Sequence, residues 1–431
     1  MRRKIMSELQ RWSSKPNRMP LLLNGARQVG KTYLLKKFGE ACYNHVAYFN
    51  LENNQRARSL FDGDLNPSVI VQNLEALSLV RIVPTNTLII LDEIQSCERA
   101  LTSLKAFCEE APEYHVVAAG SLLGVAVNRE HYSFPVGKVD EMSLWPMDFE
   151  EFLWAIGQDA LAAMIREHFQ SDEKLVNAMH DAALELYRQY LVVGGMPAAV
   201  REFRDSRSYV QVADAQQRII NEYVADMAKY AHPSTTVKIR ACYYSIPAQL
   251  AKENRKFQYK VVKRGGSATI FGEAIEWLKY AGAIIKCEKV EHGTLPIAAY
   301  TDLSDFKIYM SDVGLLTLKS GMPTALLLSP LNEDNTFMGA VVENYVAQTL
   351  VASGHHPYYW RNDNTAELDF IIQNETRVLP IEVKKGRNTR AKSLSVFVAK
   401  YKPELALRIS LKNFGCENGI KSVPLYSVHC I

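Results

Sequence analysis

The sequence predicts an α/β protein with a parallel sheet in its N-terminal third, a helical middle region and a second α/β region toward its C-terminal end. Two observations predict this order. Between residues 21 and 145, near-continuous apolar runs alternate with helical patterns, as they do in buried parallel sheets. After residue 299, strand-like and helical segments alternate again. We therefore expect more than one domain.

Length and composition agree with a modular globular protein. At 431 residues the chain is too long for a single core, because domains average roughly 150 residues. The hydrophobic share of 48% and the charged share of 23% exclude a disordered or fibrous chain. A formal net charge of +3 does not by itself indicate a nucleic-acid partner, so any basic surface must be local.

Cysteine usage and hydropathy predict a cytoplasmic protein without a membrane segment. The seven cysteines are an odd number, scattered and without a C-x-x-C pair, which argues against disulfides and zinc. The N-terminal stretch "MRRKIMSELQRWSSKPNRMP" is basic and amphipathic but lacks the apolar core of a signal peptide. The sequence contains no run of about 18 apolar residues.

Residues 1–147 form the first predicted domain, built on a parallel sheet. Each expected strand is a short apolar or β-rich run bounded by polar residues. The five runs are "PLLLNG", "HVAYFNLE", "NTLIILDE", "EYHVVAAGS" and "VDEMSLWP".

Residues 148–234 and 235–298 are predicted to be an all-α lid and a winged-helix-like segment. In the lid, "MDFEEFLWAI" opens a helix, and Gly194, Gly195 and Pro197 interrupt the helical pattern further on. In the second segment, "ATIFGEAIEWL" carries apolar residues at helical spacing. A glycine turn and an apolar strand follow, and this order is typical of a winged helix.

Residues 299–431 are predicted to form a second α/β domain. Its expected elements are a strand, an amphipathic helix, a β-hairpin and a further helix. The corresponding stretches are "FKIYMSD", "FMGAVVENYVAQTLVASG", "ELDFIIQNETRVLPIEVKK" and "AKSLSVFVAKY".

The stretch "GARQVGKT" matches the full G-x-x-x-x-G-K-[ST] pattern between a strand and a helix, which predicts a phosphate-binding loop. Backbone N–H groups of such a loop surround the β-phosphate of ATP, while the lysine reaches the β- and γ-phosphates. The threonine hydroxyl binds Mg²⁺. The predicted nucleotide-binding residues are Gly25, Ala26, Arg27, Gln28, Val29, Gly30, Lys31 and Thr32.

Acidic residues after the third apolar run complete the predicted ATP site. In "TLIILDE", Asp92 is placed to hold Mg²⁺ and Glu93 to polarise the attacking water. Ser121 follows the next run, "HVVAAG", and would lie near the γ-phosphate if that strand is inserted between the other two. Lys31, Glu93 and Ser121 are therefore the predicted catalytic residues of this site.

Together these motifs resemble the P-loop ATPases of the AAA+ and related class, the ASCE type, which carry an additional strand and a catalytic glutamate. The stretches "LNGARQVGKT", "LDEIQ", "AAGSLLG", "LWPMDFEEFL", "VVGGMPAAV" and "KIYMSDVGLL" resemble, more closely, one prokaryotic family. Its members join an AAA-type ATPase domain to a C-terminal domain of unknown function numbered 4143 (DUF4143). The resemblance runs from Met1 past Lys402.

One position departs from that family's pattern. Where its members commonly have a Gly-Arg pair, this chain has Gly137 and Lys138. Lysine cannot make the planar bidentate contact of an arginine finger, so Arg129 is a substitute candidate. Alternatively, Arg129 and Lys138 are solvated loop charges.

The hairpin near the C-terminal end carries a second constellation. Glu382 and Lys384 stand at i and i+2 of one strand and therefore project to the same face, and Asp369 can meet Glu382 across the hairpin. Two carboxylates and a lysine are what Mg²⁺-dependent phosphodiester cleavage needs. Alternating charge on an exposed strand is the other interpretation.

This hairpin resembles the PD-(D/E)XK nuclease core. The resemblance implies a further acidic residue on the first helix of that fold, and Glu343 in "VVENYVAQTL" matches it. It makes Asp369, Glu382 and Lys384 catalytic residues, and Glu343, Asp369 and Glu382 metal ligands. Glu367 is either an additional ligand or a surface charge.

Two local basic clusters are suited to phosphate contacts with DNA or RNA. In AAA-type proteins a winged-helix-like unit also acts as a lid on the nucleotide, so the first cluster has two interpretations. The clusters are Lys256, Lys260, Lys263 and Arg264, and Lys385, Arg387, Arg390 and Lys392.

We hypothesise that ATP binding and hydrolysis control a nuclease-like domain acting on nucleic acid. The main alternative is a nucleotide-dependent switch whose C-terminal domain binds a protein or nucleic acid without cutting it. A remodelling motor is a further alternative, and it predicts a closed homo-oligomeric ring with an arginine acting between subunits.

Overall fold

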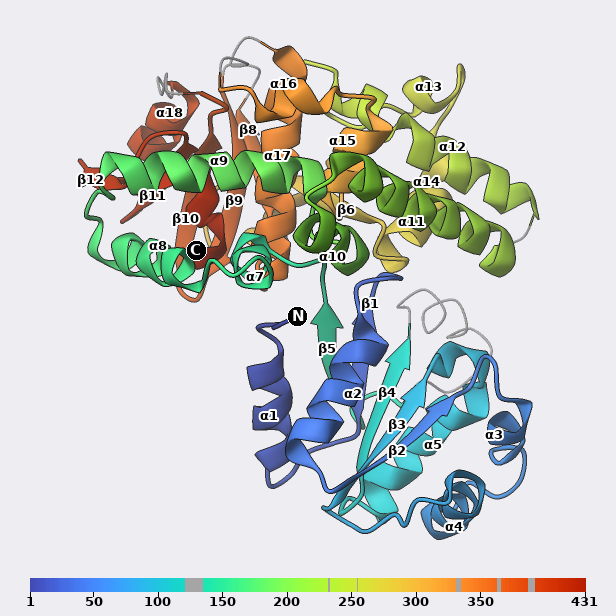
Figure 1. Cartoon of the computed structure of the whole chain (residues 1–431). Coiled ribbons are helices and arrows are strands. Elements are labelled where there is room, and N and C mark those ends of the chain that lie inside the picture. The colour runs from blue at the N-terminus through green and yellow to red at the C-terminus, as the bar shows by residue number, and fades with distance from the viewer. Residues whose placement is uncertain (121–134, 232, 254, 331–334, 363–365, 387–391) are drawn as a thin grey trace. The chain divides into compact units, whose positions relative to one another are not determined.

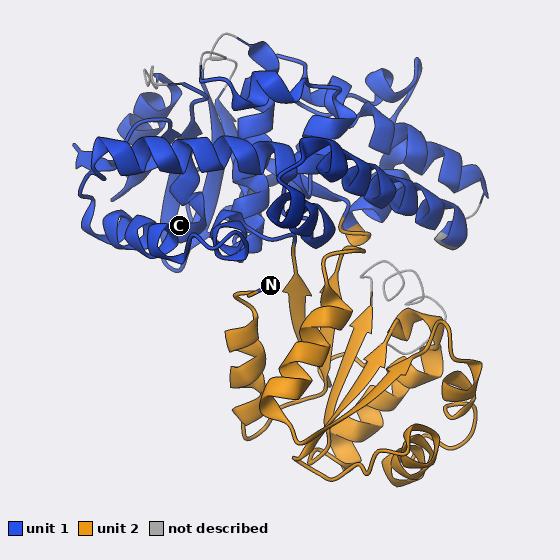
Figure 2. Ribbon diagram, viewed as in Figure 1, with its two compact units in different colours: residues 1, 146–279, 283–431 blue, residues 2–145, 280–282 orange. Residues whose placement is uncertain are grey.

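The structure is a computed structural model and describes the whole chain except residues 121–134, 232, 254, 331–334, 363–365 and 387–391. The described residues form two compact units (Figure 2). The N-terminal unit contains residues 2–145 and 280–282. The C-terminal unit contains residues 1, 146–279 and 283–431.

A parallel sheet forms the centre of the N-terminal unit (Figure 1). Among the described residues it has five strands in the order β2-β3-β4-β1-β5. All five predicted runs form these strands, so the predicted parallel sheet is confirmed. The strands are β1 (Leu21–Gly25), β2 (His45–Asn50), β3 (Thr87–Asp92), β4 (His115–Gly120) and β5 (Asp140–Leu144).

Helices cover both faces of this sheet. They are α1 (Met6–Ser14), α2 (Lys31–Cys42), α3 (Gln55–Ser59), α4 (Pro67–Ser78) and α5 (Glu98–Glu110), with a short 3₁₀ helix η1 (Ile94–Ser96). Gly39 of α2 lies against Val46 and Leu88. The next strand residues, Ala47 and Ile89, belong to a core shared with α4 and α5. Because successive strand residues face opposite sides, α2 lies on one face and the α4–α5 pair on the other.

The strand order places the predicted ATP-site residues at one edge of the sheet. β4 lies between β3 and β1, as the prediction for Ser121 required. Since all five strands are parallel, their carboxyl ends share an edge, and ligands of open α/β sheets bind there. The loop after β1 and the acidic pair at the end of β3 are therefore neighbours.

After residue 146 the chain is helical, which confirms the prediction for the middle region. Asp148 begins the first helix with a capping box, because its side chain accepts from the Glu151 N–H at 2.9 Å and Glu151 reaches back to the Asp148 N–H. The helices are α7 (Phe149–Ala155), α8 (Asp159–Ser171), α9 (Asn177–Val193), α10 (Pro197–Ser206), α11 (Tyr209–Tyr230), α12 (Pro233–Leu250), α13 (Tyr259–Val262) and α14 (Ala268–Tyr280).

A mixed sheet forms the rest of the C-terminal unit, with eight strands among the described residues in the order β12-β13-β11-β10-β9-β8-β6-β7. The strands are β6 (Ile284–Val290), β7 (Thr301–Met310), β8 (Tyr358–Asn362), β9 (Ala366–Asn374), β10 (Arg377–Val383), β11 (Ala406–Ser410), β12 (Gly415–Glu417) and β13 (Ile420–Pro424). The α-helices are α15 (Val313–Lys319), α16 (Thr324–Leu328), α17 (Thr336–Ala352) and α18 (Lys392–Tyr401), and the 3₁₀ helices are η3 (Ile297–Tyr300) and η5 (Leu425–Cys430).

The strand that was predicted for the winged-helix-like segment is β6, which belongs to this larger sheet. β6 pairs antiparallel with β7 on one side and parallel with β8 on the other. β8 in turn pairs with β9, the first strand of the predicted hairpin. Residues 284–310 and the C-terminal strands therefore share one sheet rather than forming separate bodies.

Three stretches that are far apart in the sequence meet at Gly195. Its N–H donates to the buried Asp312 carboxylate at 2.6 Å, and its carbonyl accepts from the Met147 N–H at 2.7 Å. A Cβ at residue 195 would lie 2.0 Å from the Met147 carbonyl oxygen, so only glycine fits. Asp312 also caps α15 by accepting from the Leu315 N–H at 2.9 Å. Residues 194–195 and 311–314, which belong to two of the stretches that carry the family resemblance, therefore contact each other at this position.

Among the described residues, the helices are too short or too polar to cross a membrane, and the cysteines are unpaired. No helix in the described ranges combines the length and the apolarity that crossing a membrane requires. All seven cysteines carry free thiols. Burial raises the pKa of the Cys242 thiol to about 12, so this side chain is a protonated packing group.

Candidate functional sites

The predicted phosphate loop curls around its own lysine. Lys31, the first residue of α2, is 8% exposed, and its ammonium donates to the carbonyl oxygens of Gly25 and Ala26 at 2.8 and 2.9 Å. Gly30 has φ +93°, and a Cβ at Gly25 would lie 2.4 Å from a backbone oxygen of β5. The two motif glycines are therefore required by the loop's conformation.

Arg3 links the phosphate loop to the end of β5 through hydrogen bonds to backbone carbonyls. Its guanidinium donates to the Val29 carbonyl at 2.9 Å and to the Trp145 carbonyl after β5. Arg27 at the tip of the loop lies 4.0 Å from the carboxylate of Glu52. Arg3 could not be predicted as a loop contact, because it lies more than 20 residues before the motif in an ordinary basic N-terminal stretch.

Asp92 lies at the centre of the predicted magnesium site. Its Oδ2 accepts from the Thr32 hydroxyl at 2.7 Å and from the Tyr48 hydroxyl at 2.8 Å. Its Oδ1 accepts from the Glu93 N–H at 3.1 Å. Burial and this hydrogen bond raise the pKa of Tyr48 to about 12, so the phenol remains a donor. A hydroxyl and a carboxylate at this distance form the hard oxygen set that Mg²⁺ prefers.

Glu93 has an unusual backbone conformation, and its side chain accepts a hydrogen bond from Gln95, which was not among the predicted site residues. The Glu93 backbone is left-handed, with φ +55°, a conformation that is costly for a residue with a Cβ. Gln95 donates its amide to the Glu93 carboxylate at 2.5 Å. This contact fixes the direction of the carboxylate that we expect to activate water.

Replacing Tyr48 by phenylalanine is expected to lower ATP turnover about tenfold at low Mg²⁺, because a hydrogen bond to a charged group contributes about 1.5–3 kcal/mol. Without this donor, Asp92 is oriented less firmly for the cation. Turnover should be measured against Mg²⁺ concentration, with Tyr114→Phe, at the opposite edge of the sheet, as the matched control. An unchanged Mg²⁺ dependence would remove Tyr48 from the site.

The other predicted catalytic positions differ in what the structure describes. Ser121 and Arg129 lie outside the described residues. Lys138 precedes β5 and therefore lies at the edge where the parallel strands begin, opposite the phosphate loop of its own unit. It pairs with Glu109 at 2.9 Å and is 40% exposed, which agrees with the interpretation as a solvated charge.

The predicted β-hairpin is present and brings Asp369 and Glu382 together. β9 and β10 pair antiparallel, and the last paired residues are Phe370 and Ile381. Continuing this register by one residue on each strand places Asp369 opposite Glu382. The Asp369 Oδ2 accepts from the Val383 N–H at 2.7 Å. Asp369 is the fourth residue of β9.

Glu382 is a buried carboxylate with an adjacent lysine. Lys384 donates to its Oε1 at 2.5 Å, as their shared strand face predicts. Burial, followed by the negative charge of Asp369, raises the pKa of Glu382 to about 7. Its other oxygen, Oε2, is buried without a hydrogen-bond partner among the described residues.

A divalent cation fits the Asp369–Glu382 pair but not the predicted set of three carboxylates. Within the described residues, no group of three or more His, Cys, Asp or Glu side chains is placed to hold a metal ion. The unpartnered Glu382 oxygen beside Asp369 is nevertheless a ready oxygen donor. Mg²⁺ needs only one or two protein carboxylates when water and phosphate oxygens complete its shell.

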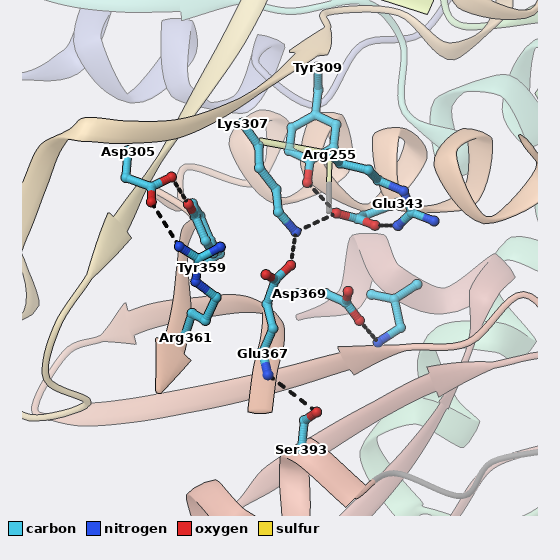
Figure 3. A network of polar contacts seen from close by, with 11 residues as sticks. Arg255, Asp305, Lys307, Tyr309, Glu343, Tyr359, Arg361, Glu367, Asp369 and Ser393 are labelled. Atoms are coloured by element: carbon cyan, nitrogen blue, oxygen red, sulfur yellow. Dashed lines mark hydrogen bonds and ion pairs between the residues drawn. The ribbon is translucent and has the colours of Figure 1, made fainter. Parts of the chain in front are cut away.

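Glu343 lies on α17 in a buried polar network (Figure 3). Its carboxylate accepts from the Tyr309 hydroxyl and pairs with the Arg255 guanidinium and, at 3.2 Å, with the Lys307 ammonium. Lys307 also pairs with Glu367 at 2.7 Å. Glu343 and Lys307 are each 1% exposed. The structure therefore surrounds Glu343 with cations, and Glu367 is an ion-pair partner.

The predicted basic clusters are only partly available for phosphate contacts. Lys256 pairs with Asp305 at 2.7 Å, whereas Lys263 and Arg264 are exposed between α13 and α14. In the second cluster, Lys385 donates to the Asn335 carbonyl at 2.9 Å. Arg387 and Arg390 lie outside the described residues.

Family models match three consecutive parts of the chain. An AAA domain (AAA_14) matches residues 17–153. A domain of unknown function (DUF8612) matches residues 184–326, and a second (DUF4143) matches residues 338–428. The P-loop, the acidic strand end and the five-stranded parallel sheet thus define a P-loop ATPase domain of the AAA type. The chain joins this domain to a DUF8612 domain and a DUF4143 domain, and the resemblance to the ATPase–DUF4143 architecture is confirmed.

Solved structures resemble the chain only distantly. A Walker-type ATPase of Pyrococcus abyssi is 13% identical with a TM-score of 0.44, over 74% of this chain and 95% of that chain. The ORC2 protein of Aeropyrum pernix in its ADP form is 14% identical with a TM-score of 0.34, over 78% and 94%. Such low values carry no conclusion about function. No curated protein matches the chain.

Proposed function

We propose that this chain is a Mg²⁺-dependent ATPase whose nucleotide state controls a nuclease-like site in its C-terminal unit. One observation carries the first part: the Thr32 hydroxyl and the Asp92 carboxylate meet at 2.7 Å, at the sheet edge where Lys31 and the phosphate loop lie. These side chains are brought together from β3 and α2, as binding of Mg²⁺ and ATP requires.

In this proposal each residue of the ATP site has a separate task. The loop N–H groups and Lys31 hold the β- and γ-phosphates, and Thr32 and Asp92 hold the cation. When bound, Mg²⁺ offsets the negative charge that the phosphates accumulate. Glu93, oriented by Gln95, accepts the proton of the attacking water. Ser121 remains a predicted contact of the γ-phosphate.

The second part rests on the hairpin. Asp369 and Glu382 would hold a divalent cation, which lowers the pKa of a bound water and screens the charge of a phosphodiester. Lys384 is placed beside Glu382 to stabilise the negative charge that develops on a cleaved phosphate. The burial of Glu382 supports a functional rather than a surface interpretation of the D…E-x-K pattern.

The switch without cleavage is the second candidate, and one observation favours it. Glu343 is engaged by Arg255, Lys307 and Tyr309, so the third predicted ligand faces cations. Cations at this position would also suit the binding of an anionic partner that is not cut.

The deciding experiment incubates the full-length protein with ATP and Mg²⁺ or Mn²⁺ on single- and double-stranded DNA and RNA. Lys31→Ala should abolish ATP binding, and Asp369→Asn should lower cleavage about 100-fold or more without affecting ATP turnover. Asp302→Asn, a partly exposed carboxylate on β7, is the matched control for the second variant.

Cleavage that depends on Asp369 and changes in Lys31→Ala supports an ATP-controlled nuclease. If ATP is hydrolysed but no substrate is cut, the switch is the better description. Absence of ATP binding by the wild-type protein would contradict the first part of the proposal.

A further inference from the structure

A cavity beside the hairpin is built from two different parts of the chain. Its volume is about 610 Å³, within the range of about 300–1,000 Å³ typical of small-ligand sites. Glu343, Asp369 and Lys384 line the cavity, together with Lys252 and Arg255 from the segment after α12. The cavity therefore joins the region matched by DUF8612 to the region matched by DUF4143.

Arg255 is placed by specific local features. Its backbone is left-handed, with φ +48°, and its guanidinium pairs with the buried carboxylate of Glu343. Gly339 belongs to α17, and a Cβ at this position would lie 2.7 Å from the Arg255 Nη2. Because glycine has no side chain, the Arg255 guanidinium can lie against this part of α17. Arg255 is 23% exposed and thus reaches solvent at the cavity.

The Glu343 carboxylate orients Arg255, and the cavity lining as a whole keeps a positive charge. Glu343 also binds Lys307, which in turn binds Glu367, so the carboxylate is shared between two cations (Figure 3). Lys252, Lys384 and Lys385 add positive charge to the lining, and Glu253 and Asp369 add negative charge, so the cations outnumber the carboxylates by one when Arg255 and Glu343 are included. Arginine offers five N–H donors in a planar fork that matches the oxygens of a phosphate, which a lysine cannot reproduce.

We propose that Arg255 is the phosphodiester-binding residue of a composite site, in which the DUF8612 region supplies the anion contact and the DUF4143 hairpin supplies the carboxylates. The inference rests on the proposed function of the hairpin and names its substrate class as a nucleic-acid strand. A backbone phosphate seated on Arg255 lies in the same cavity as Asp369 and Lys384. Glu343 is a positioning residue that keeps the guanidinium in place.

The test measures binding of a fluorescent 12-nucleotide single-stranded DNA, and of RNA with the same sequence, to the full-length protein in EDTA. Arg255→Gln should raise Kd about tenfold or more and reduce the slope of log Kd against log salt by about one. Arg255→Lys should bind with intermediate affinity. Arg377→Gln, an exposed arginine at the far end of the hairpin, is the matched control and should bind as the wild type does.

A second variant leaves every charge in place. Gly339→Ala favours the helix, because alanine has a higher helix propensity than glycine, but its Cβ would lie 2.7 Å from the Arg255 Nη2, so the end of the flexible arginine side chain must shift. It should raise Kd about threefold or more without lowering the melting temperature. This variant keeps the inference testable if Arg255→Gln fails to fold.

The outcomes separate this inference from the proposed nuclease. Wild-type binding in both Arg255→Gln and Gly339→Ala overturns the composite site, even if Mn²⁺-dependent cleavage is intact. Binding that depends on Arg255, in a protein that cuts no substrate, supports the site and rejects the nuclease. A preference for DNA over RNA, or the reverse, identifies which strand the site takes.

Discussion

Replacing Glu93 by glutamine is expected to lower ATP turnover by a factor of about 10²–10⁴ while ATP still binds. Glutamine has nearly the same shape but cannot accept a proton from water, so the chemical step loses its general base. The phosphate loop is untouched, because Lys31 and Thr32 make their contacts independently of Glu93. The variant should therefore trap the nucleotide-bound state.

Steady-state release of phosphate and equilibrium binding of a fluorescent ATP analogue measure the two halves of this expectation. Glu110→Gln, an exposed carboxylate at the end of α5, changes the same charge away from the site and should behave as the wild type. Turnover by Glu93→Gln within a factor of about three of the wild type would show that another group activates water.

Replacing Asp312 by alanine is expected to lower the free energy of unfolding of the C-terminal unit by about 3 kcal/mol. The change removes the cap of α15 and leaves the Gly195 N–H buried without an acceptor. The corresponding shift in Tm is about 5 °C, because the entropy of unfolding of a unit of this size is roughly 0.6 kcal/mol/K. Thermal unfolding should be compared with Asp205→Ala, an exposed carboxylate in the same unit. Equal Tm values would contradict the junction at Gly195.

The pH dependence of unfolding provides an independent check of the same residue. Burial raises the pKa of Asp312 to about 6, so the folded unit binds this proton more tightly than the unfolded chain does. The proton-linked part of its contribution to stability is therefore complete below about pH 4 and is lost as the pH rises through about 6, whereas the hydrogen bonds from the Gly195 and Leu315 N–H groups do not require the proton. Asp312→Ala should lack this part of the pH dependence.

Much of the N-terminal unit could be predicted from the sequence because its signals are local. Apolar runs of strand length alternate with helices, and the phosphate loop is one continuous motif. The parallel arrangement then brings Asp92 to Thr32 without further information. The contact of Tyr48 with Asp92 could not be predicted, because Tyr48 is an ordinary strand residue and only the pairing of β2 with β3 places it beside Asp92.

The hairpin was also predictable, since its turn and its two strands are adjacent in the chain. The environment of the hairpin was not. Lys307 lies in a stretch that reads as a strand, and the alternation of Asp305, Lys307 and Tyr309 along one buried face was the available signal. Arg255 gave no such signal, because its partner Glu343 is 88 residues away (343 minus 255). Long-range charge pairing of this kind needs a three-dimensional structure.

The shared sheet has a practical consequence for dissecting the protein. β8, within the DUF4143 region, pairs with β6, which lies in the DUF8612 region. A fragment that begins after residue 326 lacks β6 and β7, and therefore exposes the backbone of β8 as a bare edge on which other chains can add strands. Such fragments are prone to self-association, and they also lack Arg255 and Lys307. Biochemical work on the hairpin therefore requires the full chain.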